Sequence, residues 1–183
     1  DGSERVAKRF RLVEYPTAEI HGAVFATLTV GAVDDVEAWL GDMADCLAML
    51  RLHELHRYDV ETKLPSGNWK ATADGYLDGY HLGYLHRNTI GGKSITNRNT
   101  YDLFGPHVRI GFANKPILEL RDTPVEEWDK YSAFSLVHYL FPNISISGHP
   151  DRSLMVSRMF PGPKVGECSV VQYQYFREPL DTP

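Results

Sequence analysis

The chain from Asn68 to His86 reads NWKATADGYLDGYHLGYLH. It contains two histidines, His81 and His86, five positions apart, and Asp78 lies three positions before the first of them. Neutral imidazole is a common ligand of Fe, Zn, Cu and Ni. A regular helix turns by about 500° over five residues, so two rings at this spacing would point about 140° apart. The rings can therefore share one metal ion only if the helix bends or ends between them, which the glycines on either side of His81 favour.

The spacing by itself leaves the role of these histidines open. Two imidazoles in a tyrosine-rich helix can be partly buried and held by hydrogen bonds alone. Asp78 favours the metal interpretation, because a metal-bound histidine commonly donates its other ring nitrogen to a carboxylate. A zinc-dependent hydrolase that uses His81, His86 and a carboxylate is one alternative. A non-enzymatic helix-grip domain that binds a ligand in an apolar cavity is another.

The same stretch resembles the mononuclear-iron motif of the Rieske non-haem iron oxygenases, in the catalytic domain of the α (large) subunits of ring-hydroxylating oxygenases. The family motif runs Asn-Trp-Lys, then an acidic residue with Asn, then Asp-x-Tyr-His-x4-His. This chain matches it in order and spacing with Asn68-Trp69-Lys70, Asp74-Gly75, Asp78-Gly79-Tyr80-His81 and His86. It departs from the motif at Gly75, where the family often has Asn, and this puts in doubt any supporting amide contact at that position.

The resemblance implies a site of two histidines and one carboxylate that leaves open positions on Fe(II) for O2. His81 and His86 map onto the two histidine ligands, and the third ligand, a carboxylate from a late helix, is expected beyond Pro183. Asp78 maps onto the residue that links a histidine on the iron to a histidine ligand of a Rieske cluster in a neighbouring subunit. The alternative is that Asp78 only caps local backbone.

Three further residues of the motif fall around this site, namely Asp74, Gly75 and Tyr80. For Asp74 two arrangements stay open, burial near the site or capping of a break in the helix. Tyr80 carries an aromatic side chain, whose usual role is packing.

The resemblance also implies an activity. The protein is expected to activate O2 at mononuclear Fe(II) and to hydroxylate or dihydroxylate an aromatic or related organic substrate. The electrons would come from NAD(P)H through a reductase, often with a ferredoxin, and then through a [2Fe–2S] Rieske cluster. Neighbouring α subunits are expected to form a homotrimer or an α3β3 assembly, by analogy with the fold family.

The cysteines place the Rieske cluster outside this chain. Such a cluster needs two cysteines and two histidines, and neither Cys46 nor Cys168 lies in a C-x-H or C-x2-H pattern. We therefore expect residues 1–183 to be a single, truncated catalytic domain. Residues 1–20 would connect it to an upstream Rieske domain.

Composition excludes several other classes. The 183 residues carry a net charge of −5 and show no dense Lys/Arg patch, which argues against a nucleic-acid partner. No apolar run approaches the length of about 20 residues that a membrane span requires, and no signal peptide opens the chain. Two distant cysteines do not suggest a disulfide framework, so the expected location is the cytoplasm.

The order of the predicted elements indicates an α+β fold with a curved antiparallel sheet. We predict a buried strand over 22–30, a helix over 35–50, a half-solvated strand over 54–64, a turn at 65–67, two helical pieces around Gly75 and a loop over 87–99. That loop is either a substrate lid or a simple linker. Further strands are predicted over 100–104, 107–113, 132–140, 143–147, 153–160 and 168–176, the last two as a hairpin.

The family resemblance narrows this to a helix-grip fold of the Bet v 1-like or SRPBCC type, with iron held between the sheet and the helices. The remaining histidines, His107, His138 and His149, are expected to be structural. Cys46 is expected to be a small buried apolar side chain.

Overall fold

The computed structural model describes residues 12–32 and 35–180. Its main feature is a seven-stranded sheet in the order β3-β9-β8-β7-β6-β5-β4, in which every neighbouring pair is antiparallel. The strands are β3 (His56–Ser66), β4 (Ser94–Phe104), β5 (His107–Asn114), β6 (Phe134–Leu140), β7 (Ile144–His149), β8 (Ser153–Pro161) and β9 (Cys168–Phe176). The predicted α+β class and the predicted C-terminal hairpin are confirmed.

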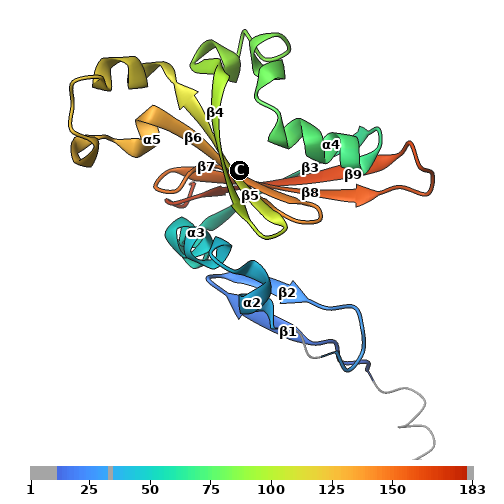
Figure 1. Cartoon of the computed structure of the whole chain (residues 1–183). Coiled ribbons are helices and arrows are strands. Elements are labelled where there is room, and N and C mark those ends of the chain that lie inside the picture. Colours follow the sequence, from blue (N-terminus) through green and yellow to red (C-terminus); the bar gives the residue numbers. More distant parts are fainter. Residues whose placement is uncertain (1–11, 33–34, 181–183) are drawn as a thin grey trace, which may run out of the picture.

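Two helices cover opposite faces of this sheet. Helix α4 (Trp69–Leu77) lies along one face, and α3 (Met43–Leu50) lies on the other (Figure 1). Side chains alternate between the faces of a strand, so neighbouring residues of β6 enter different cores. Tyr139 packs with Ala73 of α4, whereas Leu140 packs with the α3 cluster that includes Leu47.

The helix predicted over 35–50 is interrupted. Asp35 caps α2 (Val36–Leu40), and its carboxylate accepts a 2.9 Å hydrogen bond from the Ala38 backbone N–H. The chain then turns at Gly41, whose φ of 52° suits glycine, before α3 begins. Cys46 of α3 is buried, as predicted.

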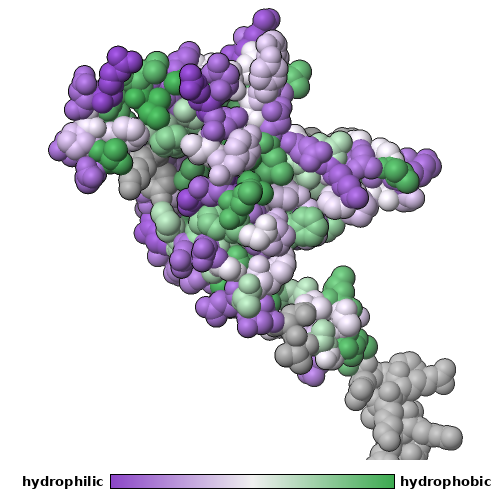
Figure 2. All heavy atoms as spheres, viewed as in Figure 1, coloured by the Kyte–Doolittle hydropathy of each residue, from purple (hydrophilic) through white to green (hydrophobic). Residues whose placement is uncertain are grey.

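The buried strand predicted over 22–30 is wrong. Only 23–26 is a strand (β2, Ala23–Ala26), and it pairs with β1 (Thr17–Ile20) in a separate two-stranded sheet. Because this hairpin lies outside the main sheet, Val24, Leu28 and Val30 are 73%, 83% and 63% exposed. Figure 2 shows hydrophobic residues on the surface of this part of the chain. Of the connecting segment expected over 1–20, residues 1–11 lie outside the described residues.

The remaining differences concern where elements begin and end. β3 runs through the predicted turn to Ser66, and β4 takes up the second half of the loop expected over 87–99. A short helix, α5 (Lys130–Ala133), precedes β6. Short 3₁₀ segments connect the larger elements, namely η1 (Leu52–Glu54), η2 (Tyr80–Gly83), η3 (Ile90–Gly92), η4 (Lys115–Leu120) and η5 (Val125–Glu127). Within the described part of the chain, no helix has the length and apolar character needed to cross a membrane.

The burial of α3 side chains in the core allows a prediction about stability. Leu47 is fully buried, whereas Met49 on the same helix is 58% exposed. Leu47→Ala should lower the free energy of unfolding by about 2–5 kcal/mol, because it removes buried methyl groups and leaves a cavity. Met49→Ala should change it by less than about 0.5 kcal/mol. Urea denaturation of both variants checks this, and equal losses would contradict the assignment of Leu47 to the core.

Candidate metal centre

Helix α4 presents the first residues of the site. The side chain of Asn68 accepts a 2.9 Å hydrogen bond from the Lys70 backbone N–H, so the predicted N-cap is confirmed. Its amide also donates to the Val165 carbonyl at 2.8 Å, which ties the start of the helix to the β8–β9 connection. The predicted break at Gly75 is wrong, because α4 continues to Leu77. A single glycine costs only about 1 kcal/mol in a helix, and packing of the helix on the sheet offsets this.

The helix instead ends at Asp78. The carboxylate of Asp78 accepts hydrogen bonds from the backbone N–H groups of Tyr80 at 2.9 Å and of His81 at 3.2 Å. These bonds satisfy the free N–H groups at the start of η2. The α-helix thus ends before both histidines, and their spacing no longer separates the rings by the helical angle. The ring centroids of His81 and His86 lie 5.3 Å apart, with the ring planes at 70°.

Asp78 also determines the state of the His81 ring. Its second oxygen lies 3.0 Å from His81 Nδ1. The Tyr80 backbone hydrogen bond, with a further contribution from His81, lowers the pKa of the Asp78 carboxyl below its ordinary value. An ionised carboxylate accepts but cannot donate, so Nδ1 carries a hydrogen, and in the neutral ring Nε2 is the nitrogen that offers a lone pair. Nε2 is the atom that a metal ion would bind.

Three glycines allow the histidine-bearing turn to pack closely on its surroundings. A Cβ at Gly79 would lie 2.3 Å from the Asn99 side chain, and one at Gly83 would lie 2.8 Å from that of Thr96, both on β4. At Gly91 it would lie 2.1 Å from the Leu82 carbonyl oxygen and 2.9 Å from that of His86. Any side chain at Gly91 therefore requires the backbone of the histidine turn to move.

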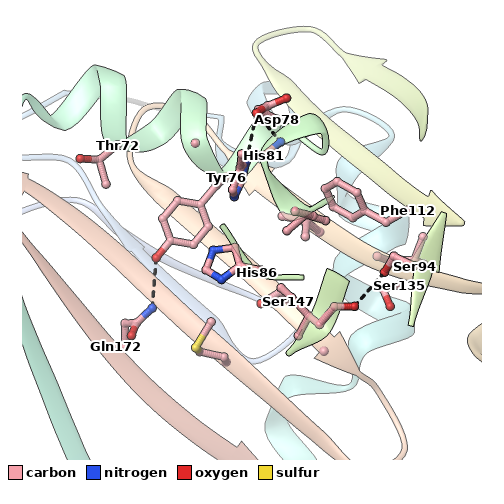
Figure 3. A pocket seen from close by; sticks show the side chains of 17 residues that line it. Thr72, Tyr76, Asp78, His81, His86, Ser94, Phe112, Ser135, Ser147 and Gln172 are labelled. Atoms are coloured by element: carbon pink, nitrogen blue, oxygen red, sulfur yellow. Dashed lines mark hydrogen bonds and ion pairs between the residues drawn. The ribbon is translucent and has the colours of Figure 1, made fainter. Parts of the chain in front are cut away.

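A cavity of about 620 Å³ lies between α4, η2 and the sheet, and both histidines line it. Figure 3 shows His86 and Tyr76 directed into this space, with Asp78 beside His81 at its edge. The cavity is largely apolar, and its apolar lining comes from Leu82, Ile90, Phe112, Leu136, Val137 and Met155. Its size suits a small organic ligand.

The structure brings together three of the predicted site residues, His81, His86 and Asp78. Gly75 lines the cavity, whereas Asp74 does not. Both expectations for Asp74 are wrong, because it is exposed on a continuous helix and caps no break. Tyr80 does not line the cavity, is 63% exposed and pairs its hydroxyl with that of Tyr84 at 3.1 Å. Within residues 12–32 and 35–180 no three Cys, His, Asp or Glu side chains form a metal-binding group.

The other histidines behave as predicted. His107 is buried, accepts from the Phe141 N–H at Nδ1, and lies 3.1 Å from the Trp39 carbonyl at Nε2. Burial lowers its pKa. Burial, with a smaller effect of Arg109, lowers the pKa of His138 to about 4. Both are therefore neutral structural groups at neutral pH. His149 accepts from the Asp151 N–H within a turn.

The residues that sequence reasoning missed lie on the cavity wall. Tyr76 shares a helix face with Thr72 and Gly75, so helical spacing would have grouped these three. Gln172 and Met155 come from β9 and β8, and only the pairing register shows that they face α4. No local pattern in the sequence marks them.

Comparison with known proteins identifies the family of this chain. A family model described as the ring hydroxylating alpha subunit (catalytic domain) matches residues 49–181. The chain belongs to this family. The resemblance noted from the motif is thereby confirmed.

Individual relatives share only part of their length with this catalytic domain. This chain is 33% identical over 97 residues to the anthranilate 1,2-dioxygenase large subunit of Acinetobacter baylyi. The match covers 49% of this chain and 19% of the relative. Crystal structures of the quaternary ammonium Rieske monooxygenase CntA, with an inhibitor and with L-carnitine, align with TM-scores of 0.72 and 0.70 at 16% and 17% identity. They cover 92% of this chain and 43% and 42% of CntA, and at this identity they show the fold alone. The chain spans less than half the length of these relatives.

The glycines provide a matched test of the packing around the site. Gly91→Ala should lower the free energy of unfolding by about 1–3 kcal/mol, because the new Cβ forces the Leu82 backbone to move. Gly75→Ala should raise it by up to about 1 kcal/mol, because its Cβ meets nothing within 4 Å and alanine favours the helix. Urea denaturation measures both, and two variants of equal stability would contradict the close approach at Gly91.

Proposed function

We propose that this chain is the catalytic part of a Rieske oxygenase that uses mononuclear Fe(II) and O2 to hydroxylate or dihydroxylate an aromatic or related organic substrate. The observation that carries the proposal is the convergence of His81 and His86 on one wall of an apolar cavity, with the Asp78 carboxylate on the far nitrogen of His81. Membership of the ring-hydroxylating family supports the reaction class.

The two histidines fit a shared metal ion. An imidazole nitrogen binds a metal at about 2.1 Å, so two rings on one ion have centroids within about 6.5 Å of each other. The observed separation of 5.3 Å satisfies this limit. Two imidazoles and a carboxylate are the donor set of non-haem Fe(II) sites with open positions. The third ligand, a carboxylate, stays a prediction.

Each part of the site then has a definite task. His81 and His86 would hold the ion through ring nitrogens, and bound Fe(II) would supply the chemistry of O2 activation. Asp78 keeps His81 in the tautomer that offers Nε2 and restricts the rotation of the ring. The apolar walls would hold the substrate ring beside the histidines and exclude water from it.

Asp78 is also the proposed entry point for electrons. Its side chain is 50% exposed although it contacts His81, so one carboxylate faces both the site and the molecular surface. The capping role considered as the alternative is present in the structure as well, and the two roles are compatible because capping uses the same ionised group. A neighbouring α subunit in a trimer or α3β3 assembly would supply the [2Fe–2S] cluster. NAD(P)H, a reductase and a ferredoxin would supply the electrons.

Removing either histidine tests the metal site. In the full-length protein, His81→Ala and His86→Ala should each lower the content of mononuclear iron to background and abolish turnover. Each variant removes one of the two histidine ligands, and the remaining histidine cannot hold the ion in its place. His53→Ala, in the exposed η1 turn, should change neither. Elemental analysis of the purified proteins measures the loss. Full iron content in both site variants would refute the proposal, and stoichiometric zinc with activity that needs no reductant would favour a hydrolase.

Asp78 allows capping to be separated from electron transfer. Asparagine keeps one acceptor oxygen for the Tyr80 backbone cap, but its amide nitrogen cannot accept from the His81 ring as the second carboxylate oxygen does. Asp78→Asn should therefore keep the iron and the fold while lowering turnover by about 100-fold. Steady-state rates and iron content, measured on the same preparation, check this. Turnover by an Asp78→Ala enzyme would refute the proposed bridging role of this carboxylate.

A further inference from the structure

One polar group on the cavity wall belongs neither to the metal centre nor to the core. The side-chain amide of Gln172 on β9 donates to the Tyr76 hydroxyl of α4 and to the Ser157 hydroxyl of β8, at 3.1 Å each. The strand register explains the second bond, because Ser157 and Gln172 lie directly opposite each other. Figure 3 shows the first bond reaching across the cavity from the sheet to the helix.

This arrangement fixes the direction of one hydroxyl group. The Tyr76 oxygen accepts from Gln172, so its own hydrogen must point elsewhere, and no described residue accepts it. The hydroxyls of Thr72, Ser94 and Ser135, which also line the cavity, already donate to Asn68, Ile90 and Asn114 at 3.1, 3.3 and 3.2 Å. The hydroxyl of Ser147 also lines the cavity, but within the described part of the chain no hydrogen bond orients it. Tyr76 is therefore the pre-oriented donor of the cavity.

The charges of the lining are equally specific. Among the described residues that line the cavity there is no Lys or Arg. The one carboxylate, Asp78, is already engaged by His81 and by two backbone N–H groups. An anionic substrate group at the Tyr76 end would lose its hydration without gaining a cationic side-chain partner, which is strongly unfavourable. A neutral oxygen would lose little and would gain the Tyr76 hydrogen bond.

We infer that Tyr76, held by Gln172 and Ser157, is the specificity-determining group of this cavity, and that it selects uncharged aromatic substrates bearing one hydrogen-bond-accepting oxygen over their carboxylate counterparts. The inference rests on the proposed function only in treating the cavity as the substrate site. It concerns how the substrate is recognised, and it makes no use of the iron.

Equilibrium binding tests this without turnover. The full-length protein is titrated calorimetrically with 2-naphthamide, 2-naphthoate and naphthalene, which share a ring system and differ in one group. The amide should bind at least about tenfold more tightly than the carboxylate. Tyr76→Phe should weaken amide binding by about tenfold and leave naphthalene binding unchanged, because it removes one neutral hydrogen bond. Tyr101→Phe, whose hydroxyl donates to the Leu77 carbonyl outside the cavity, is the matched control.

A second variant reverses the preference. Gln172→Lys places a cation beside Tyr76 and should make 2-naphthoate the tighter ligand. Tighter binding of the carboxylate by the unaltered protein would overturn the inference, as would equal losses for all three compounds in Tyr76→Phe or failure of the unaltered protein to bind the amide. Iron content is measured separately, so a protein that binds iron but fails these titrations refutes the subsite and leaves the proposed function standing.

Discussion

The hydrogen bonds of the Asp78 carboxylate are the interaction on which the site depends. One oxygen ends α4 by accepting from the Tyr80 N–H, and the other accepts from both the backbone and the ring of His81. Without this change of direction the helix would continue, and two histidines five residues apart would diverge by about 140°. A single ionised group thus sets the backbone path, the tautomer of one histidine and the approach of the second. The surrounding glycines matter because they let this turn lie against β4.

The sequence predicted those features that depend on local physics. Alternating side chains identified all the main strands. The glycine-flanked motif predicted that the helix bends or ends between the two histidines, whereas α4 ends before both of them. The sequence overestimated the effect of Gly75, because the packing of α4 on the sheet is a tertiary effect. The sequence also misplaced the strand at 22–30. Its apolar residues suggested a buried strand, although the hairpin pairs only with itself.

The contacts that form the cavity wall could not be predicted from the sequence, for a different reason. Tyr76, Gln172 and Ser157 are brought together by the register between β8 and β9 and by the placement of α4 above them. A register is a long-range property, and a shift by one residue would turn every side chain of a strand to the other face. The metal motif is contained in nineteen consecutive residues, from Asn68 to His86, and so was visible at once. Ser157 and Gln172, in contrast, lie 81 and 96 residues beyond Tyr76 in the sequence.

The two faces of the sheet pack against different helices, so neighbouring residues of one strand enter different cores. Leu140 and Leu154 pack on the α3 side, while Tyr139 and Met155 face the α4 side. Positions such as Met155 give the scaffold an evolutionary freedom, because the shape of the cavity can change there while the neighbouring Leu154 keeps its place in the α3 core.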